Sequence, residues 1–225
     1  MIPWKLLAKA QTPGDLAELS LWQRDTEFSI KLGNDELMNS YNHGSEDALG
    51  TLACQKIRKQ PGNRVLVGGL GMGFTLRCAL DELGDTAQVV VAEFVEEVVD
   101  WNRGVLAHLA DSPVDDRRVK IQVADVTQVI KSASNDYDAI MLDVDNGPQA
   151  MTSKENDWLY SLKGLQTSFA ALRPKGVLAI WSTDPSPAFS KRLSQAGFQV
   201  DEVKLRSRGG KKGGGHFIVW VAQRS

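Results

Sequence analysis

A short apolar run that ends in four glycines within six residues constrains this chain more than any other stretch. Val65–Val67 has the composition of a buried strand, and a helical pattern begins at Phe74. The glycines between them are Gly68, Gly69, Gly71 and Gly73. Glycine permits positive φ and lets a ligand approach the backbone, and the amides at a helix start then face that ligand. The stretch therefore predicts the strand, turn and helix that open a nucleotide-binding βαβ unit.

A tight turn that merely packs a helix on a strand would explain the glycines equally well. A second predicted strand favours ligand binding. Gln88–Glu93 ends in a carboxylate that lies 22 residues after Gly71. A doubly wound fold places there the acid that accepts hydrogen bonds from a ribose. We therefore expect Glu93 to lie beside the glycine turn.

Two further predicted strands, 118–125 and 137–143, also end in acids, Asp125 and Asp143, and Asp145 follows closely. Any one of these acids can be a simple helix N-cap. Because open α/β sheets bind ligands beyond the carboxyl ends of their strands, we expect all of them to share one rim with Glu93. Such a rim suggests an adenosine ligand.

In this arrangement the glycine turn holds the tail that is joined to the ribose. Glu93 accepts hydrogen bonds from both ribose hydroxyls. Asp125, with the backbone near Val126, accepts from the adenine amino group. Asp143 faces the reactive end. If Asp143 and Asp145 are both buried, their proximity raises one of the two pKa values.

A polar cluster, 39–46, precedes the glycine turn and contains Tyr41, His43 and Glu46. It ends at Ser45, which is a plausible N-cap for a predicted helix from residue 46 to about 59. A capped surface loop explains this composition without any catalytic role. The sharper interpretation places Tyr41, His43 and Glu46 at the mouth of the site, as catalytic candidates beside Asp143 and Asp145.

Composition excludes several classes of function. The chain has 225 residues, a length usual for one α/β domain, and a net charge of −2 gives no case for nucleic acid or an anionic membrane. No apolar run approaches 18 residues, so we expect neither a membrane span nor a signal peptide. Cys54 and Cys78 lack metal spacing, so we expect buried reduced thiols and a cytoplasmic location. Three dispersed histidines predict no metal site.

The remaining pattern predicts one α/β chain. Residues 1–25 are expected to form an irregular arm, and Glu27–Leu32 with 36–38 a β-hairpin. Further helices are predicted at 74–83, 95–110, 126–132, 156–172 and 186–196, and further strands at 177–181, 198–205 and 216–222. We divide the chain into 1–60, holding the arm, hairpin and lead-in helix, and 61–225, a Rossmann-like domain that binds the adenosyl ligand.

The last two predicted strands are joined by the glycine- and lysine-rich segment 206–215, in which no helix fits, so they must be antiparallel. This ending disfavours a dinucleotide-binding dehydrogenase. It is similar to the seven-stranded, mostly parallel sheet of S-adenosylmethionine-dependent transferases. The predicted fold class is therefore α/β, with a Rossmann-like sheet whose last strand is antiparallel, preceded by a short N-terminal β-hairpin.

From residue 27 to its end, the chain resembles the spermidine synthase-like (polyamine aminopropyltransferase-like) branch of the class I methyltransferase fold. The resemblance is carried by Val65–Gly73, by Glu93 with Val98–Arg103, by Val123–Asp125 and by Tyr137–Asp143. It implies that the glycine loop, Glu93 and Asp125 bind an adenosyl sulfonium. It also implies that Asp143 stands where aminopropyltransferases keep the carboxylate that handles the acceptor amine.

The chain departs from that family pattern in three places. Met72 stands where the family has a loop acid near the donor's aminopropyl ammonium. Asp143 and Asp145 are two residues apart, whereas the family's acids are three apart. Glu46 matches the last member of a Tyr-His-Glu segment, but the tyrosine and histidine do not match. The N-terminal region is also short, and a homodimer is the assembly we expect.

Three functions remain open. The first is an S-adenosylmethionine-dependent methyltransferase acting on an unknown small molecule, because Met72 removes the cation partner and the glycine amides suit a carboxylate. The second is a polyamine aminopropyltransferase that uses decarboxylated S-adenosylmethionine, favoured by Asp143 and the overall resemblance. The third is a non-enzymatic module that binds an adenosyl ligand. In both enzymatic cases the acceptor is a small molecule, for which an amine is one candidate.

Overall fold

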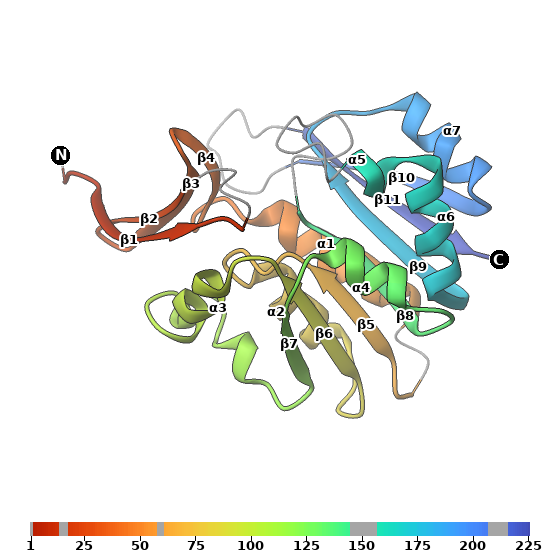
Figure 1. The fold of residues 1–225 in the computed structure, drawn as a ribbon, viewed down its shortest axis with the longest axis horizontal. Coiled ribbons are helices and arrows are strands. Elements are labelled where there is room, and N and C mark those ends of the chain that lie inside the picture. Colours follow the sequence, from red (N-terminus) through yellow and green to blue (C-terminus); the bar gives the residue numbers. More distant parts are fainter. Residues whose placement is uncertain (1, 14–17, 58–60, 145–156, 207–215) are drawn as a thin grey trace.

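The computed structural model describes residues 2–13, 18–57, 61–144, 157–206 and 216–225. Two sheets make up its β structure (Figure 1). The first is antiparallel, with the strand order β1-β2-β3-β4. Its strands are β1 (Lys5–Gln11), β2 (Glu18–Arg24), β3 (Glu27–Leu32) and β4 (Asp35–Asn39). The second sheet has seven strands and carries the glycine loop.

The expectation of an irregular arm over residues 1–25 is wrong. β1 and β2 pair as an antiparallel hairpin, with Lys5 opposite Gln23 and Gln11 opposite Glu18. β1 contains no β-branched residue, so its sequence gives a weak strand signal. Pairing with β2, whose Leu21 is fully buried, supplies the stabilisation that the local sequence lacks. The hairpin predicted over 27–38 is confirmed as β3 and β4, which turn at Gly33 with φ of 59°.

The seven-stranded sheet has the order β10-β11-β9-β8-β5-β6-β7. Its strands are β5 (Arg64–Gly68), β6 (Gln88–Glu93), β7 (Val119–Val123), β8 (Tyr137–Leu142), β9 (Leu172–Ser182), β10 (Phe198–Arg206) and β11 (His216–Arg224). β11 is antiparallel to both of its neighbours, and the β5–β6, β5–β8, β6–β7 and β8–β9 pairs are parallel. The predicted fold class is confirmed, although β9 begins earlier than expected.

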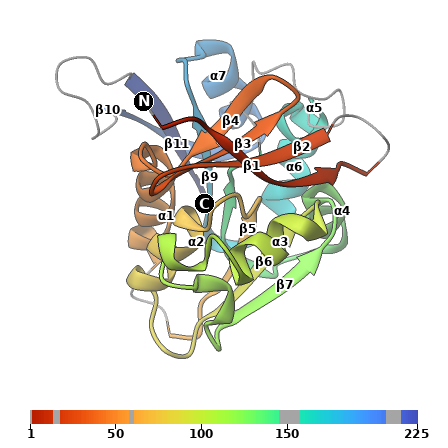
Figure 2. The same ribbon diagram turned by 90° about the vertical axis from the view of Figure 1, so that its left-hand side faces the viewer.

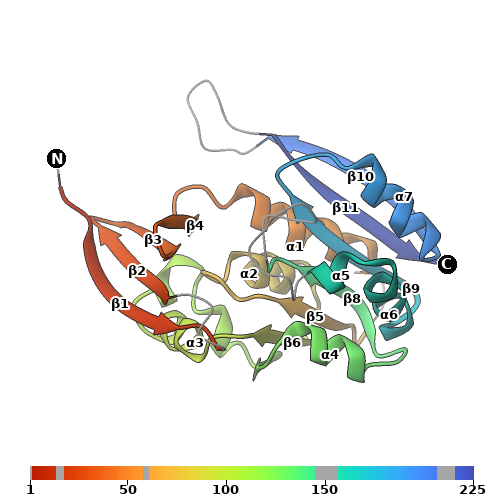
Figure 3. The same cartoon turned by 45° about the horizontal axis from the view of Figure 1, so that its top comes forward.

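Helices cover both faces of this sheet (Figures 2 and 3). The helices are α1 (Gly44–Ile57), α2 (Phe74–Glu82), α3 (Glu96–Arg103), α4 (Val126–Ser132), α5 (Asp157–Tyr160), α6 (Leu162–Ala171) and α7 (Pro187–Gln195). One apolar cluster joins α1, α2 and α3 to the sheet and also takes in the N-terminal sheet, whose Phe28 ring meets the His108 ring edge-on at 5.7 Å. A second cluster joins α4–α7 to the opposite face. Within the described residues no helix is long and apolar enough to cross a bilayer.

Two predicted helices are shorter than expected. The helix predicted over 95–110 ends at Gly104, whose backbone leaves helical geometry, and a separate 3-10 turn follows at Ala107–Leu109. The helix predicted over 156–172 is divided at Ser161, whose side chain accepts a hydrogen bond from Gly164 N–H and so starts α6 anew. Apolar periodicity continues through both breaks, which explains why the sequence pattern predicts single helices.

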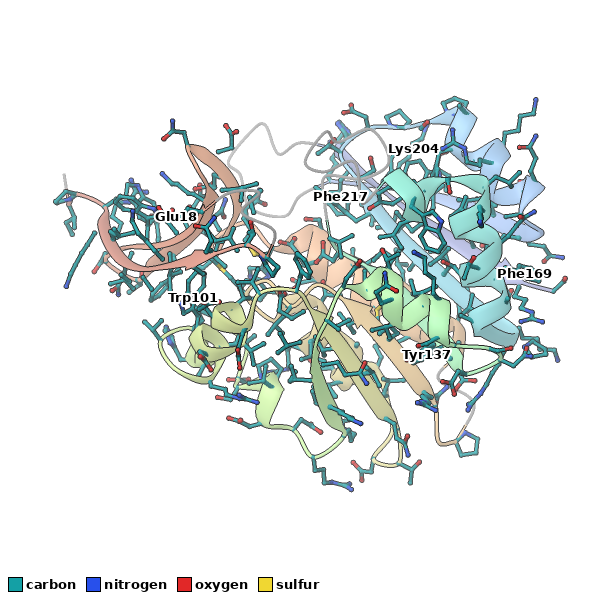
Figure 4. The ribbon with its side chains drawn as sticks, in the orientation of Figure 1. Glu18, Trp101, Tyr137, Phe169, Lys204 and Phe217 are labelled. Carbon is teal, nitrogen blue, oxygen red and sulfur yellow. The ribbon has the colours of Figure 1, made fainter. Side chains whose placement is uncertain are left out.

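The sheet reverses its winding direction beside β5. From β5 the chain proceeds to β6 and β7 on one side, and then returns to β8 and β9 on the other. The carboxyl ends of β5 and β8 therefore meet at the topological switch point, where open α/β sheets bind their ligands. In Figure 4, Tyr137 at the start of β8 and Phe217 near the start of antiparallel β11 lie at opposite ends of the sheet. Phe217 marks the end at which the parallel strands finish, since Ile218 pairs with Ser182, the last residue of β9.

Candidate functional site

The glycine loop after β5 lies directly against the end of β8. Gly69 has φ of 87°, and a Cβ added there would lie 2.5 Å from the backbone oxygen of Asp143. Asp143 N–H donates a hydrogen bond to the backbone oxygen of Gly68 at 3.0 Å. A side chain at residue 69 is thus excluded both by backbone conformation and by space. The predicted turn therefore sits at the switch point with Asp143 beside it.

Two other elements hold the loop from its sides. A Cβ at Gly71 would lie 2.8 Å from Sδ of Met38 on β4, so the N-terminal sheet reaches the loop. Asn102 on α3 donates from Nδ2 to the oxygens of Gly71 and Val98, both within 2.9 Å. Neither Met38 nor Asn102 carries a sequence signal that singles it out. Together with the end of β8, these two contacts fix the loop from three elements distant in sequence.

Glu93, the last residue of β6, meets the loop as expected. Its carboxylate accepts hydrogen bonds from Leu70 N–H at 2.8 Å and from Val95 N–H at 2.9 Å. Burial raises the pKa of Glu93, and the bonds from these backbone amides oppose that rise. Backbone amides of Gly71 and Phe94 also act on this carboxylate, which ties the end of β6 closely to the glycine loop.

Asp125 and Val126 follow β7 at the neighbouring strand end. Ala124 N–H donates to the oxygen of Glu93 at 2.8 Å, which ties the ends of β6 and β7 together. Asp125 accepts a hydrogen bond from Thr127 N–H at 2.7 Å and so caps α4. A Cβ at Gly68 would lie 2.8 Å from a methyl carbon of Val126. Asp125 is thus an N-cap, the simpler of its two expected roles, and it also lies on the shared rim.

Asp143 is a rim acid whose pKa is raised close to neutral pH. Its residue is only half-buried, but the surrounding protein removes most water from the carboxyl group. This desolvation, together with the nearby charge of Glu46, raises its pKa to about 7. A hydrogen bond of 2.9 Å from the Thr75 hydroxyl partly opposes the rise. Asp143 therefore changes charge near neutral pH, which suits an acid or base.

Glu46, in the first turn of α1, is the acid that faces Asp143. It is 8% exposed, and burial raises its pKa, whereas a hydrogen bond from the Ser45 hydroxyl and the proximity of His43 lower it. The charge of Glu46 is one of the causes that raise the pKa of Asp143. Asp145 lies outside the described residues, so both its role and its expected effect on the pKa of Asp143 stay predictions.

His43 and Tyr41 belong to the same polar segment but are placed differently. The ring of His43 stacks on Phe74 at 4.0 Å between centroids, and its Nδ1 lies 2.9 Å from Asp47. Tyr41 is 55% exposed, and its pKa is raised by partial burial and by Glu36. Within the described part of the chain, neither side chain forms a hydrogen bond or ion pair with Asp143. Their catalytic roles stay predictions.

Two apolar residues of the loop do not face the rim. Leu70 is 4% exposed and Met72 is fully buried, and both belong to the apolar cluster beneath α1, α2 and α3. The position that Met72 shares with the family's loop acid therefore contributes packing. Among the described residues, no group of three or more His, Cys, Asp or Glu has the arrangement of a metal site.

Comparison with known proteins identifies the family. The model of the spermine/spermidine synthase domain matches residues 52–196, which is more than half of the chain. The chain belongs to the spermine/spermidine synthase family. The matched range includes the glycine loop, Glu93, Asp125 and Asp143, whereas Glu46 precedes it. The resemblance inferred from the sequence is thereby confirmed.

A family relative is the polyamine aminopropyltransferase of Saccharolobus solfataricus, which is 27% identical over 182 residues. The match covers 81% of this chain but only 59% of that protein, so the chain spans less than two thirds of its relative. Spermidine synthase from Thermotoga maritima has a similar structure, with a TM-score of 0.76 and 18% identity, covering 98% of this chain and 73% of the other.

Two further structures share the fold of this family member. A spermidine synthase in complex with the transition state analogue AdoDATO has a TM-score of 0.76 and 17% identity, with 98% and 73% coverage of the two chains. A probable spermidine synthase from Corynebacterium glutamicum has a TM-score of 0.68 and 15% identity, with 97% and 80% coverage. At these identities the structural likeness establishes the fold.

Proposed function

We propose that this protein is a polyamine aminopropyltransferase that moves an aminopropyl group from decarboxylated S-adenosylmethionine to an amine acceptor. One observation carries the proposal: Asp143 lies against the glycine loop, paired with Glu46 and with its pKa raised to about 7. A carboxylate poised in this way beside a ligand-binding loop suits the removal of a proton from an attacking amine. The family match and the aminopropyltransferase relative support the same reaction.

In this function the donor lies along the rim. The loop Gly68, Gly69, Gly71 and Gly73 borders its sulfonium tail, Glu93 accepts from the ribose hydroxyls, and Asp125 with the Val126 backbone meets the adenine. Phe94, which directly follows Glu93 and is 39% exposed, offers an apolar ring to the adenosine. No aromatic signal in the sequence had distinguished Phe94 from a core residue.

The transfer requires one bond to form and one to break. The neutral acceptor nitrogen attacks the aminopropyl carbon bonded to sulfur, a C–N bond forms, and the C–S pair of electrons leaves with sulfur as a neutral thioether. Asp143 takes the proton that the acceptor nitrogen must lose. The protein aligns nucleophile and carbon, since the sulfonium is already a good leaving group.

Charge on the rim favours the decarboxylated donor. Glu46, Glu93 and Asp143 bring three carboxyl groups to this region, and Arg77 of the adjacent α2 is engaged with Asp81 and Asp111. A donor that carries an ammonium without a carboxylate, and an acceptor that is an amine, suit such an acidic surface. In this function the rim carboxyl groups balance the charge of the aminopropyl ammonium, so an acid at the position of Met72 is not required.

Methyl transfer from S-adenosylmethionine is the second candidate. It is favoured by Leu70 and Met72, which leave the loop without an acid to balance the aminopropyl ammonium. Backbone amides of a glycine loop at a helix start suit the carboxylate of the complete donor.

Three further expectations stay predictions: the identity of the acceptor, a homodimeric assembly and a cytoplasmic location.

Product identification distinguishes these functions. The protein is incubated with putrescine and either decarboxylated or complete S-adenosylmethionine, and the products are separated and identified by mass spectrometry. Spermidine and methylthioadenosine from the decarboxylated donor are the expected products. Methylated amine with S-adenosylhomocysteine would instead establish methyl transfer. Tight donor binding with no product from a panel of amines would indicate the non-enzymatic module.

Glu93→Gln is expected to weaken binding of decarboxylated S-adenosylmethionine about 10- to 100-fold, because the ribose loses hydrogen bonds to a charged acceptor. Isothermal titration calorimetry measures the loss. Glu97→Gln, an exposed acid in the first turn of α3, is the matched control and should bind normally. Unchanged affinity in a folded Glu93→Gln variant would remove Glu93 from the donor site.

A further inference from the structure

The hydroxyl of Thr75 lies between two oxygen atoms from different parts of the chain. Thr75 is the second residue of α2 and is 3% exposed. Its Oγ1 lies 2.9 Å from Oδ2 of Asp143 and 3.3 Å from the backbone oxygen of Glu46. One buried hydroxyl therefore joins the start of α1, the start of α2 and the end of β8.

A hydroxyl has one proton and donates one hydrogen bond at a time, whereas a backbone carbonyl can only accept. When Thr75 donates to Glu46, its contact with Asp143 is a hydrogen bond only if Asp143 carries the proton and donates it. When Asp143 is ionised, Thr75 donates to it instead and releases the carbonyl. Thr75 and Asp143 are therefore hydrogen-bonded to each other in both protonation states, and only the hydroxyl hydrogen changes direction.

The groups around Asp143 act in opposite directions on its protonation state. Burial and the carboxyl of Glu46 favour the protonated state, and the Thr75 hydroxyl favours the ionised state. Glu46 is itself faced by His43 and Asp47 from the same end of α1. In the described segments, no cationic side chain acts directly on Asp143. Hydrogen bonding by Thr75 is therefore the interaction that offsets the penalty for charging Asp143.

We propose that Thr75 is a positioning residue that keeps Asp143 in place through proton uptake and release, by turning its hydroxyl between the carboxylate and the Glu46 carbonyl. This inference rests on the proposed function, in which Asp143 takes the proton of the acceptor amine. When Asp143 carries the proton, it donates a hydrogen bond to the Thr75 hydroxyl, which in turn donates to the Glu46 carbonyl. After Asp143 releases its proton to solvent, the Thr75 hydroxyl turns back and donates a hydrogen bond to the Asp143 carboxylate.

The test compares Thr75→Val with Thr75→Ser. Removal of the hydroxyl should move the acidic limb of the kcat/KM profile up by about one pH unit and lower kcat/KM at pH 7 about fivefold, because the ionised carboxylate loses its donor. Thr75→Ser should restore the wild-type limb. Thr167→Val, which removes another helical hydroxyl that bonds only along α6 to the Lys163 oxygen, is the control and should leave the profile unchanged.

A merely structural role for Thr75 would lower activity equally at every pH, and that result would overturn the proposal. Carbon-detected NMR titration of the Asp143 carboxyl, assigned by its loss in Asp143→Asn, gives a readout without any substrate. An upward shift in Thr75→Val would support the role of Thr75 even if no aminopropyl transfer were found, and an unchanged titration would refute it. Should the valine variant not fold, Thr75→Ala removes the same hydroxyl and takes its place in both measurements.

Discussion

Asp143→Asn is expected to lower the turnover of aminopropyl transfer about 10²- to 10⁴-fold, the usual contribution of a general base. Asparagine has nearly the size of aspartate and can still accept the Thr75 hydrogen bond through its carbonyl oxygen. It cannot take a proton from the acceptor amine. The loss should therefore appear mainly in kcat, with a smaller loss of affinity for decarboxylated S-adenosylmethionine, since only one of the three rim carboxyls changes and the proposed donor contacts of Glu93 and the glycine loop are unchanged.

Steady-state kinetics with putrescine and calorimetry with the donor separate the two quantities. Asp100→Asn on α3, an exposed acid outside the rim, provides the matched control. A folded Asp143→Asn variant with wild-type turnover would show that another group accepts the proton. Loss of donor affinity with unchanged turnover at saturation would place Asp143 in the donor site instead.

The same substitution should stabilise the fold at alkaline pH. The folded-state pKa of Asp143, about 7, lies above its ordinary value of 3.8. A carboxyl with a raised pKa contributes its stability below the unfolded pKa and loses it as pH rises through the folded pKa. At pH 8 the wild type therefore holds a charge that costs up to about 4 kcal/mol of unfolding free energy, which Asp143→Asn removes. Urea unfolding at pH 4.5 and pH 8 should show the advantage growing with pH, and an advantage that shrinks would contradict the raised pKa.

Gly69→Ala is expected to destabilise the protein by roughly 2–5 kcal/mol and to abolish measurable donor binding. Two effects add at this position. The backbone has φ of 87°, which L-residues rarely adopt, and the new Cβ would lie 2.5 Å from the Asp143 backbone oxygen. The neighbour is backbone at the end of β8, so relief requires the loop and that strand end to separate. The separation would pull apart the two halves of the proposed site.

Gly62→Ala is the control that isolates the backbone contribution. Gly62 has a similar φ of 68°, but nothing lies within 4 Å of an added Cβ. It should lose only about 1–2 kcal/mol, the cost of the left-handed conformation, and should bind the donor normally. Urea unfolding and calorimetry on both variants make the comparison. Equal destabilisation of the two variants would show that the loop is not packed against Asp143.

The α/β sheet and the rim could be predicted because their signals are local. Each signal appears in a short stretch of sequence. These signals are the glycine loop, the acids Glu93, Asp125 and Asp143, and the final two strands, which are joined by a segment in which no helix fits. β5, β6 and β8 carry near-continuous apolar runs, which are typical of buried parallel strands. Sheet geometry then brings the strand ends together without further information, and the family match confirms the fold and the family that these stretches indicated.

The missed features depend on contacts between distant segments. β1 and β2 support each other by pairing, and neither has a strong strand pattern alone. Thr75, Asn102 and Met38 are ordinary residues in sequence, and only the folded chain places them against the loop and Asp143. Glu46 was a candidate because of its polar neighbours, but its pairing with Asp143 depends on how α1 packs beside β8.

A crystal structure with decarboxylated S-adenosylmethionine bound would test the central claim most directly. That claim is that the ends of β5, β6, β7 and β8 form one site for an adenosyl sulfonium. The ribose should lie within hydrogen-bonding distance of Glu93, the adenine beside Asp125 and Val126, and the aminopropyl carbon should face Asp143. A donor bound elsewhere on the protein, with Glu93 and the glycine loop free of it, would contradict the account.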